Sequence, residues 1–191
     1  GRVGSSIELV VASSLTRAIQ TADLVFPSQI CACPRVSLDV WREVSGLLVN
    51  AKRRTRTELQ DTHTSWNFDH LESEEDVLWT PEALESQAAC AHRAYLALKW
   101  AWQRPEENIG IVAHGGILAF LLSNPGHPLV QVSADARKRF HNCEMRSMVL
   151  QKIEPPPSPQ QHLDSETPAA GAGGAHETES DTYFSLHLLD V

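Results

Sequence analysis

The stretch IELVVASSLTRAIQTADLVF, residues 7–26, contains the clearest indication of the fold class. Residues 7–12 form a largely apolar run, which is typical of a strand that is covered on both faces. Helical spacing of apolar residues follows at Leu15, Ile19, Ala22 and Phe26. The small polar turn between the two parts places Arg17 at the beginning of the helix. The stretch therefore predicts a strand, a turn and a helix that opens with an arginine.

The same alternation of strand and helix signals continues along the chain. A long helix is predicted from Pro81 to Trp102, because Thr80 can cap it and its apolar residues repeat at spacings of four and three. Further strands are predicted at residues 35–41, 109–113 and 145–153, and shorter helices at 57–61 and 115–122. This order predicts an α/β domain over residues 1–153, with a mostly parallel sheet and helices on both faces.

The composition of the chain changes at Glu154. Residues 154–182 are crowded with proline, glycine, serine and acidic residues, and Leu163 is their only large aliphatic residue. Such a segment buries too little apolar surface to order itself, so we expect a flexible insertion. Alternation of apolar and polar residues returns at 183–189, which predicts a terminal edge strand within residues 183–191.

Charge and hydropathy exclude several classes of partner. The 191 residues include 16 lysines and arginines against 24 aspartates and glutamates, a formal net charge of −8, which repels nucleic acid. The longest apolar stretch, residues 117–122, falls far short of the roughly 20 residues that cross a bilayer. We therefore expect a soluble, cytoplasmic protein that binds neither membranes nor nucleic acid.

The four cysteines, Cys31, Cys33, Cys90 and Cys143, lack paired C-x-x-C spacing. Without that spacing a zinc site is not expected, and without a secretory segment a disulfide framework is not expected either. We expect reduced thiols. His63, Asp69 and His70 also lack metal-ligand spacing, and we assign no chemistry to them.

Two strand-turn-helix segments carry the candidate chemistry. In one, Arg17 begins the helix, with small hydroxyl residues in the turn before it; in the other, His114 ends a buried strand and Gly115-Gly116 begins the next helix. Ligands of open α/β sheets bind beyond the carboxyl ends of the strands, where helix N-termini attract anions. Alone, Arg17 could be a surface arginine and His114 a loop histidine. Together, they favour a phosphate site.

These segments resemble the motifs of a known family. SSLTRAIQTA, residues 13–22, and IVAHGGIL, residues 111–118, are similar to the arginine motif and the second-histidine motif of the histidine phosphatase superfamily, also called phosphoglycerate mutase-like. WREVSG, NFDHLESEEDVLW and FHNCEMRSMVL resemble further segments of that family. The resemblance covers roughly residues 7–153.

The resemblance implies a phosphoglycerate mutase-like fold and phosphoryl transfer through a phosphohistidine, without metal or other cofactor, on a small phosphorylated substrate. Arg17 would bind the phosphate with its guanidinium, and His114 would stabilise the transferring phosphoryl group. Glu43 would donate the proton to the leaving group, although a surface glutamate next to Arg42 is an alternative for it. If His114 lies beside Arg17, we expect anion binding to improve as the pH falls through about 6.5.

The sequence also departs from the family pattern. The family's nucleophile is a histidine in an Arg-His-Gly motif on a first strand, and no Arg-His-Gly occurs in the 191 residues. We therefore expect a fragment whose first strand is missing. The alternative is a non-catalytic protein that binds a phosphorylated ligand. Without that strand, the runs at 7–12 and 109–113 would pair directly or leave unpaired edges.

The basic run KRRTR, residues 52–56, has two interpretations. It could reach an anionic substrate, or it could begin a solvated basic helix. The second interpretation is favoured, because the Cys-Asp that precedes this run in the family is Asn50-Ala51 here. The oligomeric state and the identity of the substrate are not predicted.

Overall fold

The computed structural model describes residues 7–122, 127–154 and 181–188. A parallel sheet of three strands lies at its centre, in the order β2 (Arg35–Leu38), β1 (Leu9–Ser13), β3 (Ile109–Val112). β1 pairs directly with β3, and its Ala12 is in register with Val112. The two apolar runs that were predicted to be strands are therefore neighbours, and both end at the same edge of the sheet.

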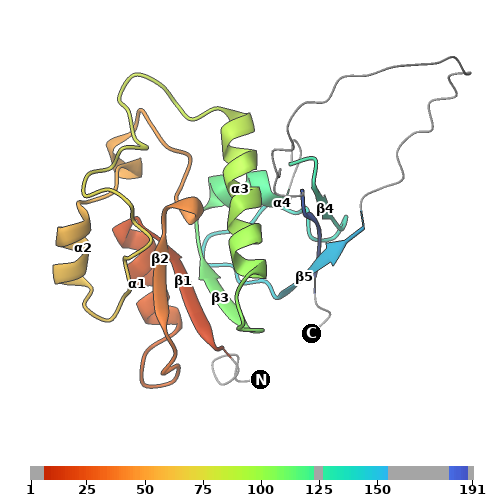
Figure 1. Ribbon diagram of the computed structural model, residues 1–191, viewed down its shortest axis with the longest axis horizontal. Helices are drawn as coiled ribbons and strands as arrows, with labels where there is room; N and C mark the ends of the chain where they lie inside the picture. Colours follow the sequence, from red (N-terminus) through yellow and green to blue (C-terminus); the bar gives the residue numbers. More distant parts are fainter. Residues whose placement is uncertain (1–6, 123–126, 155–180, 189–191) are drawn as a thin grey trace, which may run out of the picture.

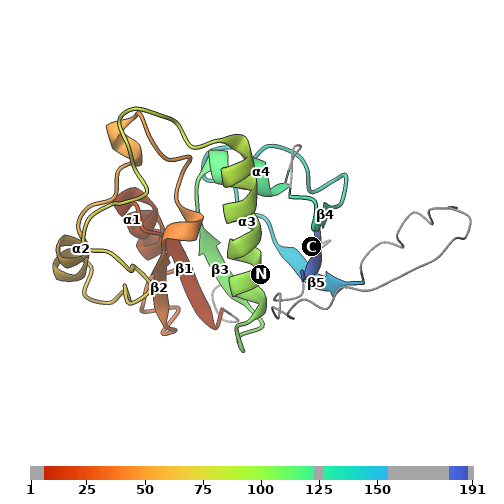
Figure 2. The same cartoon turned by 45° about the horizontal axis from the view of Figure 1, so that its top comes forward.

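Helices cover both faces of this sheet, as predicted. Alternate residues of β1 point to opposite faces: Leu9 and Val11 pack in one core cluster with helices α3 (Gln87–Trp102) and α4 (Gly115–Leu122). Val10 and Ala12 pack in a second cluster with α1 (Thr16–Val25) and α2 (Arg56–Thr62). Figures 1 and 2 show α3 on one side of the sheet and α1 on the other. The fold is an α/β sandwich of three layers.

A second sheet lies on the β3 side of the first (Figures 1 and 2). Its strand order is β4 (Val130–Val132), β6 (Tyr183–Leu188), β5 (Met148–Ile153), with β4 parallel and β5 antiparallel to β6. Residues 183–188 do form a strand, but the prediction of an edge strand is wrong, because β6 pairs on both sides. Phe184 and Leu186 of β6 are buried in the core cluster that contains α3 and α4. Residues 155–180 of the predicted insertion, and residues 189–191, lie outside the described part of the chain.

The helix predicted from Pro81 begins later, at Gln87, where the Ser86 side chain caps it by accepting a hydrogen bond from the N–H of Ala89. The preceding residues are not helical because their backbone groups bind another loop. Thr80 O accepts from the N–H of Leu47 at 2.9 Å, and the N–H of Glu85 donates to Ser45 O at 2.8 Å. The capping role predicted for Thr80 is therefore wrong.

Other predicted elements differ mainly at their ends. The second predicted strand stops at Leu38, where a 3-10 helix (Asp39–Trp41) begins, and a second 3-10 helix (Val49–Ala51) follows. α2 begins in a capping box in which Thr55 and Glu58 exchange side-chain and backbone hydrogen bonds. Within the described residues, no helix is long and apolar enough to cross a membrane.

Candidate phosphate-binding site

The site lies at the carboxyl ends of β1 and β3. β1 ends at Ser13, and α1 begins three residues later with Thr16 and Arg17. β3 ends at Val112, and His114 immediately precedes α4. Because β1 and β3 are adjacent and parallel, the two turns and both helix N-termini share one edge of the sheet. Such an edge, where helix N-termini meet, suits an anionic ligand.

His114 is mostly buried, with 8% of its surface exposed. Its Nε2 lies 2.8 Å from the hydroxyl oxygen of Ser13, which also accepts a hydrogen bond from the N–H of Leu15 at 3.2 Å. Burial, together with the positive charges of Arg17, Arg93 and Arg42, lowers the pKa of His114 to about 3. The imidazole is therefore neutral at pH 7. The free imidazole is therefore not expected to titrate near pH 6.5, and the improvement of anion binding at lower pH stays a prediction.

Arg17 is exposed, in the first turn of α1. Its Nη1 donates to the backbone carbonyl of Asn50 at 2.5 Å, and within the described residues it has no carboxylate partner. The first turn of α1 contains no acidic residue, and its N-cap residue, Leu15, offers no capping side chain. Arg17 and the N-terminus of α1 thus present positive charge that nothing in the described chain neutralises.

Glu43 is half-buried and lies at the other helix N-terminus. Its carboxylate accepts hydrogen bonds from the N–H of Val44 at 2.9 Å and from the N–H of Gly116, in α4, at 3.3 Å. A carboxylate is stabilised in this position by the helix dipole. Glu43 therefore contacts Gly116, which follows His114 by two residues, and it already occupies the anion position of α4.

The two glycines of the His-Gly-Gly turn have different surroundings. A Cβ at Gly116 would collide with the carboxylate of Glu43 and lie 2.9 Å from Val44, whereas a Cβ at Gly115 would meet nothing within 4 Å. A ligand could therefore come close to the backbone at Gly115 but not at Gly116. At Gly116, the missing side chain makes room for Glu43.

Arg93 of α3 holds the segment that carries Glu43. Its guanidinium donates to the backbone carbonyls of Val40, Arg42 and Glu43 at 3.0, 2.7 and 3.3 Å. It also forms a bidentate pair with Glu85, at 2.9 and 2.6 Å. Burial alone would raise the pKa of Glu85, but the hydrogen bonds and charge of Arg93 outweigh it and hold that pKa below its usual range. The charge of Arg93 is therefore paired, unlike that of Arg17.

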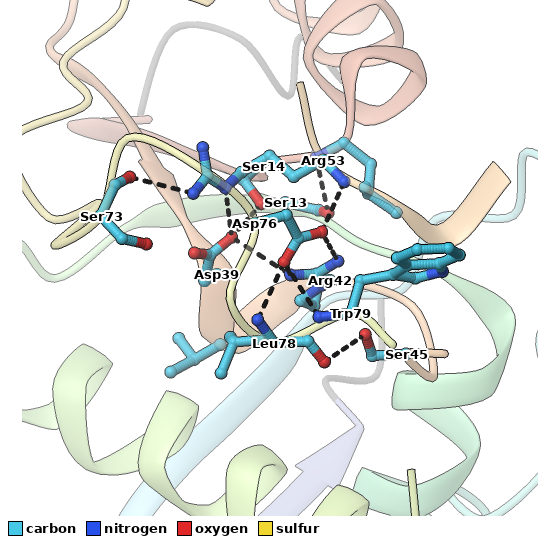
Figure 3. A network of polar contacts seen from close by, with 12 residues as sticks. Ser13, Ser14, Asp39, Arg42, Ser45, Arg53, Ser73, Asp76, Leu78 and Trp79 are labelled. Carbon is cyan, nitrogen blue, oxygen red and sulfur yellow. Dashed lines mark hydrogen bonds and ion pairs between the residues drawn. The ribbon is translucent and has the colours of Figure 1, made fainter. Parts of the chain in front are cut away.

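Figure 3 shows a buried ion pair between Arg42 and Asp76, in a network that also contains Ser14 and Asp39. Asp76 accepts from Arg42 Nη1 and Nη2 at 2.6 and 2.5 Å and from the backbone N–H of Arg53 at 2.7 Å. The N–H groups of Leu78 and Trp79 donate to it at 3.1 and 3.2 Å. The side chains of Asp76 and Arg42 are 1% and 0% exposed. Five donors thus bind one carboxylate, and they connect the loop around Asp76 to the segments that contain Arg42 and Arg53.

Arg53 extends this network toward the site. Its guanidinium donates to the backbone carbonyls of residues 73–75, at 2.8 to 3.2 Å, and its Nε lies 3.5 Å from Asp39. Asp39 in turn accepts a hydrogen bond from the hydroxyl of Ser14, next to Ser13. Neither interpretation of the basic run applies to Arg53, because this side chain is buried and structural. Lys52 and Arg54 are exposed, and α2 begins only at Arg56.

The residues to which no chemistry was assigned lie elsewhere. His63 caps the C-terminus of α2, Asp69 bonds to Asn67, and His70 packs edge-on against Trp100. In the part of the chain that the structure describes, no three His, Cys, Asp or Glu side chains are grouped as metal ligands. All four cysteines are free thiols.

Sequence reasoning placed Arg17, His114 and Glu43 but missed the residues that support them. Arg93 carried one usable signal: it lies among the buried helix positions Cys90, Ala91, Ala94 and Tyr95. A charged residue in such a place needs partners. Asp76 had no comparable local signal, because it stands in an acidic run, and its partner Arg42 is 34 residues away.

Comparison with known proteins identifies the family of this chain. The family model of the histidine phosphatase superfamily (branch 1) matches residues 3–153. A phosphoglycerate mutase-like protein of Arabidopsis thaliana is 30% identical over 173 residues, which cover 76% of this chain and 64% of that protein. Phosphoglycerate mutase-like protein 1 of the same plant is 32% identical over 173 residues, which cover 75% and 61%.

A more distant relative is phosphomutase-like protein 3 of Candida albicans, 30% identical over 117 residues, which cover 60% of this chain and 37% of that protein. The chain spans 64% and 61% of the lengths of the two Arabidopsis relatives, less than two thirds of each. No solved structure matches it significantly. The family match covers both turns of the site and most of the chain, and the chain belongs to the histidine phosphatase superfamily (branch 1), with a phosphoglycerate mutase-like α/β fold.

Proposed function

We propose that this chain carries the phosphate-binding half of an active site for phosphomonoesters, and that the complete site hydrolyses or transfers the phosphoryl group through a phosphohistidine. One observation carries the proposal. Arg17, which pairs with no carboxylate in the described part of the chain, lies at the uncapped N-terminus of α1, beside the turn that holds His114. A guanidinium and free helix N–H groups are the donors that phosphate oxygens require.

Each residue has a distinct task in the proposed reaction. Arg17 neutralises the non-bridging oxygens, for which a guanidinium is well shaped. His114, neutral in the unliganded protein, offers a ring N–H to the same oxygens, and the bound dianion offsets the three arginine charges that lower its pKa. Glu43, held at the beginning of α4, acts in its protonated form: it donates its proton to the leaving oxygen and becomes the carboxylate that accepts the N–H of Gly116.

The nucleophile is assigned to no residue of this chain. None of the 191 residues stands in an Arg-His-Gly tripeptide, and His114 has the place of the family's second histidine. Within the described residues, β3 pairs only with β1, so its other edge is unpaired on the side where the second sheet lies. We propose that a strand with the nucleophilic histidine, outside these 191 residues, pairs with that edge next to His114.

The second candidate function is that of a non-catalytic protein that binds a phosphorylated ligand. The absence of the tripeptide from the 191 residues favours it. Sequencing the transcript upstream of Gly1 separates the two candidates. An upstream reading frame with Arg-His-Gly supports catalysis, and one without it leaves only ligand binding.

Phosphate binding itself is tested by titrating the chain with inorganic phosphate and following the histidine ring signals by NMR. We expect the His114 signals to shift and its pKa to rise on binding. Arg17→Ala should weaken binding at least tenfold, about 1.4 kcal/mol. Arg54→Ala, which removes an exposed arginine elsewhere, is the matched control and should have little effect. If phosphate leaves His114 undisturbed, or if both substitutions weaken binding equally, the site is wrong.

A further inference from the structure

Two loops of the protein expose large aliphatic side chains to water. We call this group the apolar patch, and its members are Leu47, Leu48, Val49, Leu78 and Leu84, which are 48%, 64%, 75%, 50% and 52% exposed. Single exposed aliphatic residues are ordinary on a protein surface, whereas several in one place mark a surface that binds another molecule.

The two loops that carry the apolar patch are in direct contact. Gly46 packs so closely against the second loop that a Cβ there would collide with the carbonyl group of Ala83. The indole N–H of Trp79 donates to the carbonyl of Leu48 at 3.0 Å. The aliphatic side chains of the two loops are therefore neighbours on one surface.

The first loop is held in an unusual conformation. Leu47 has a φ of +55°, in the left-handed region that is unfavourable for a residue with a Cβ. Such strain persists only where the surrounding contacts impose it, and it is common at sites that bind ligands. The loop thus keeps its aliphatic side chains in water in a fixed conformation, which lowers the entropic cost of binding a partner.

The apolar patch is continuous with the phosphate-binding site through Asn50. Nη1 of Arg17 donates to the carbonyl of Asn50 at 2.5 Å, and Asn50 follows Val49 in one exposed 3-10 helix. From Asn50 to Leu47 the backbone spans at most about 11 Å. An extended peptide covers that distance in about three residues. One peptide can therefore place an anionic group on Arg17 and apolar side chains on the patch.

The charges of the two loops distinguish between possible partners. Residues 44–57 contain no acidic residue, so nothing in that segment repels a phosphate group beside Arg17. Residues 72–85 contain six acidic residues, which repel the anionic surface of a membrane. A phosphorylated protein segment, with its phosphate at the end of the patch next to Arg17, fits this distribution of charge better than a lipid surface does.

We propose that the apolar patch binds a phosphorylated segment of another protein, with the phosphate at Arg17 and large aliphatic side chains, about three residues away, on the patch. The inference rests on the proposed function, because it takes the phosphate to bind at Arg17. It names the substrate class as a phosphorylated protein side chain, whereas the family resemblance implied a small substrate. A small phosphomonoester would leave the patch exposed to water.

The test is NMR titration of the chain with synthetic peptides. The probe is a phosphoserine peptide with leucines at the second and third positions on either side of the phosphoserine. The references are the same peptide with serines in place of the leucines and the leucine peptide without phosphate, and inorganic phosphate measures the anion site alone. We expect the leucine phosphopeptide to bind about tenfold more tightly than either reference peptide, about 1.4 kcal/mol, and to shift the methyl signals of Leu48 and Leu84.

Substitutions locate the effect. Leu48→Ser should reduce the tenfold leucine preference to about threefold or less, because it removes apolar surface from the patch. Leu24→Ser is the matched control, because Leu24 is 82% exposed on α1 and outside the patch, and the leucine preference should persist in it.

The outcomes separate this inference from the proposed function. Phosphate binding that depends on Arg17 without any leucine preference overturns the inference alone, and so does a leucine peptide that binds equally well without its phosphate. Dimerisation of the chain that Leu48→Ser abolishes would assign the patch to a second copy and overturn it too. If neither inorganic phosphate nor any phosphopeptide binds, the proposed function fails and the inference fails with it.

Discussion

Replacing Asp76 by asparagine should destabilise the protein far more than the loss of one surface charge. The carboxylate accepts two hydrogen bonds from the guanidinium of Arg42 and three from backbone N–H groups, at 2.5 to 3.2 Å. Asparagine keeps the shape, but its amide group points N–H donors at the N–H donors around it. The buried Arg42 then has only Asp39, 3.9 Å away, as a counter-charge. Breaking a buried ion pair from one side costs about 3 to 5 kcal/mol. Domains of this size have only roughly 5 to 15 kcal/mol in total.

The measurement is urea unfolding followed by the fluorescence of the five tryptophans. Asp61→Asn, the same substitution at an exposed position in α2, is the control and should change the free energy of unfolding by less than about 0.5 kcal/mol. The double variant with Arg42→Gln should lose less than the two single variants together, because it leaves no unpaired charge. If Asp76→Asn costs no more than Asp61→Asn, or if the double variant is simply additive, the buried pair does not stabilise this fold.

The wild-type protein offers a second measurement of the same pair, which applies even if the variant does not fold. Burial alone would raise the pKa of Asp76, but the hydrogen bonds and charge of Arg42 and the N–H of Arg53 outweigh it, so the folded pKa is lowered. An unfolded aspartate has a pKa of about 3.9. The stabilisation is therefore complete above that value and is lost as the pH falls toward the folded pKa. The free energy of unfolding should therefore begin to decrease before Asp76 is protonated in the folded protein. A decrease that begins only after Asp76 is protonated would contradict this.

Three further substitutions test the site and the packing. His114 has a pKa of about 3 in the folded protein and roughly 6.5 in the unfolded chain, so the unfolded chain binds the proton first. The free energy of unfolding should therefore fall by about 2 kcal/mol from pH 6.5 to 5. His114→Gln should reduce this pH dependence, whereas His141→Gln, at an exposed position, should not. Gly116→Ala should lower the melting temperature because its Cβ displaces Glu43, while Gly115→Ala, with open space around it, should leave the melting temperature unchanged or raise it; equal effects would show that Glu43 does not pack there. Phe184→Ala, at a fully buried position in β6, should cost about 3 to 5 kcal/mol in urea unfolding, and a cost below about 1 kcal/mol would mean that the second sheet does not share the main core.

Much of the central layer could be predicted because its signals are local. The apolar runs at 7–12 and 109–113 became the paired strands β1 and β3, and the helical spacing after Leu15 became α1. The proximity of Arg17 and His114 could be predicted from the sequence for one reason. Parallel strands end at the same edge of a sheet, so two strand-turn-helix segments must present their turns side by side.

Predictions that depended on distant partners were the ones that changed. Thr80 and Pro81 have the local chemistry of a helix beginning, yet hydrogen bonds to residues 45–47 hold that segment outside α3. The alternation at 183–189 correctly indicated a strand, but whether it lies at an edge depends on which strands approach it. A period of apolar residues specifies an element and its buried face, and does not specify what covers that face.

The order of residues was enough to predict the strand-turn-helix units and the placement of Arg17 and His114 after two strands, and it contains the family motifs around both residues. The electrostatics of these residues depend on the tertiary structure. His114 is neutral because burial and three arginines, from α1, α3 and the segment after β2, act on it together. Asp76 is held by Arg42, 34 residues away, and Arg53. Free energies of this kind depend on distance and on exclusion of water, which the folded chain sets and the order of residues does not state.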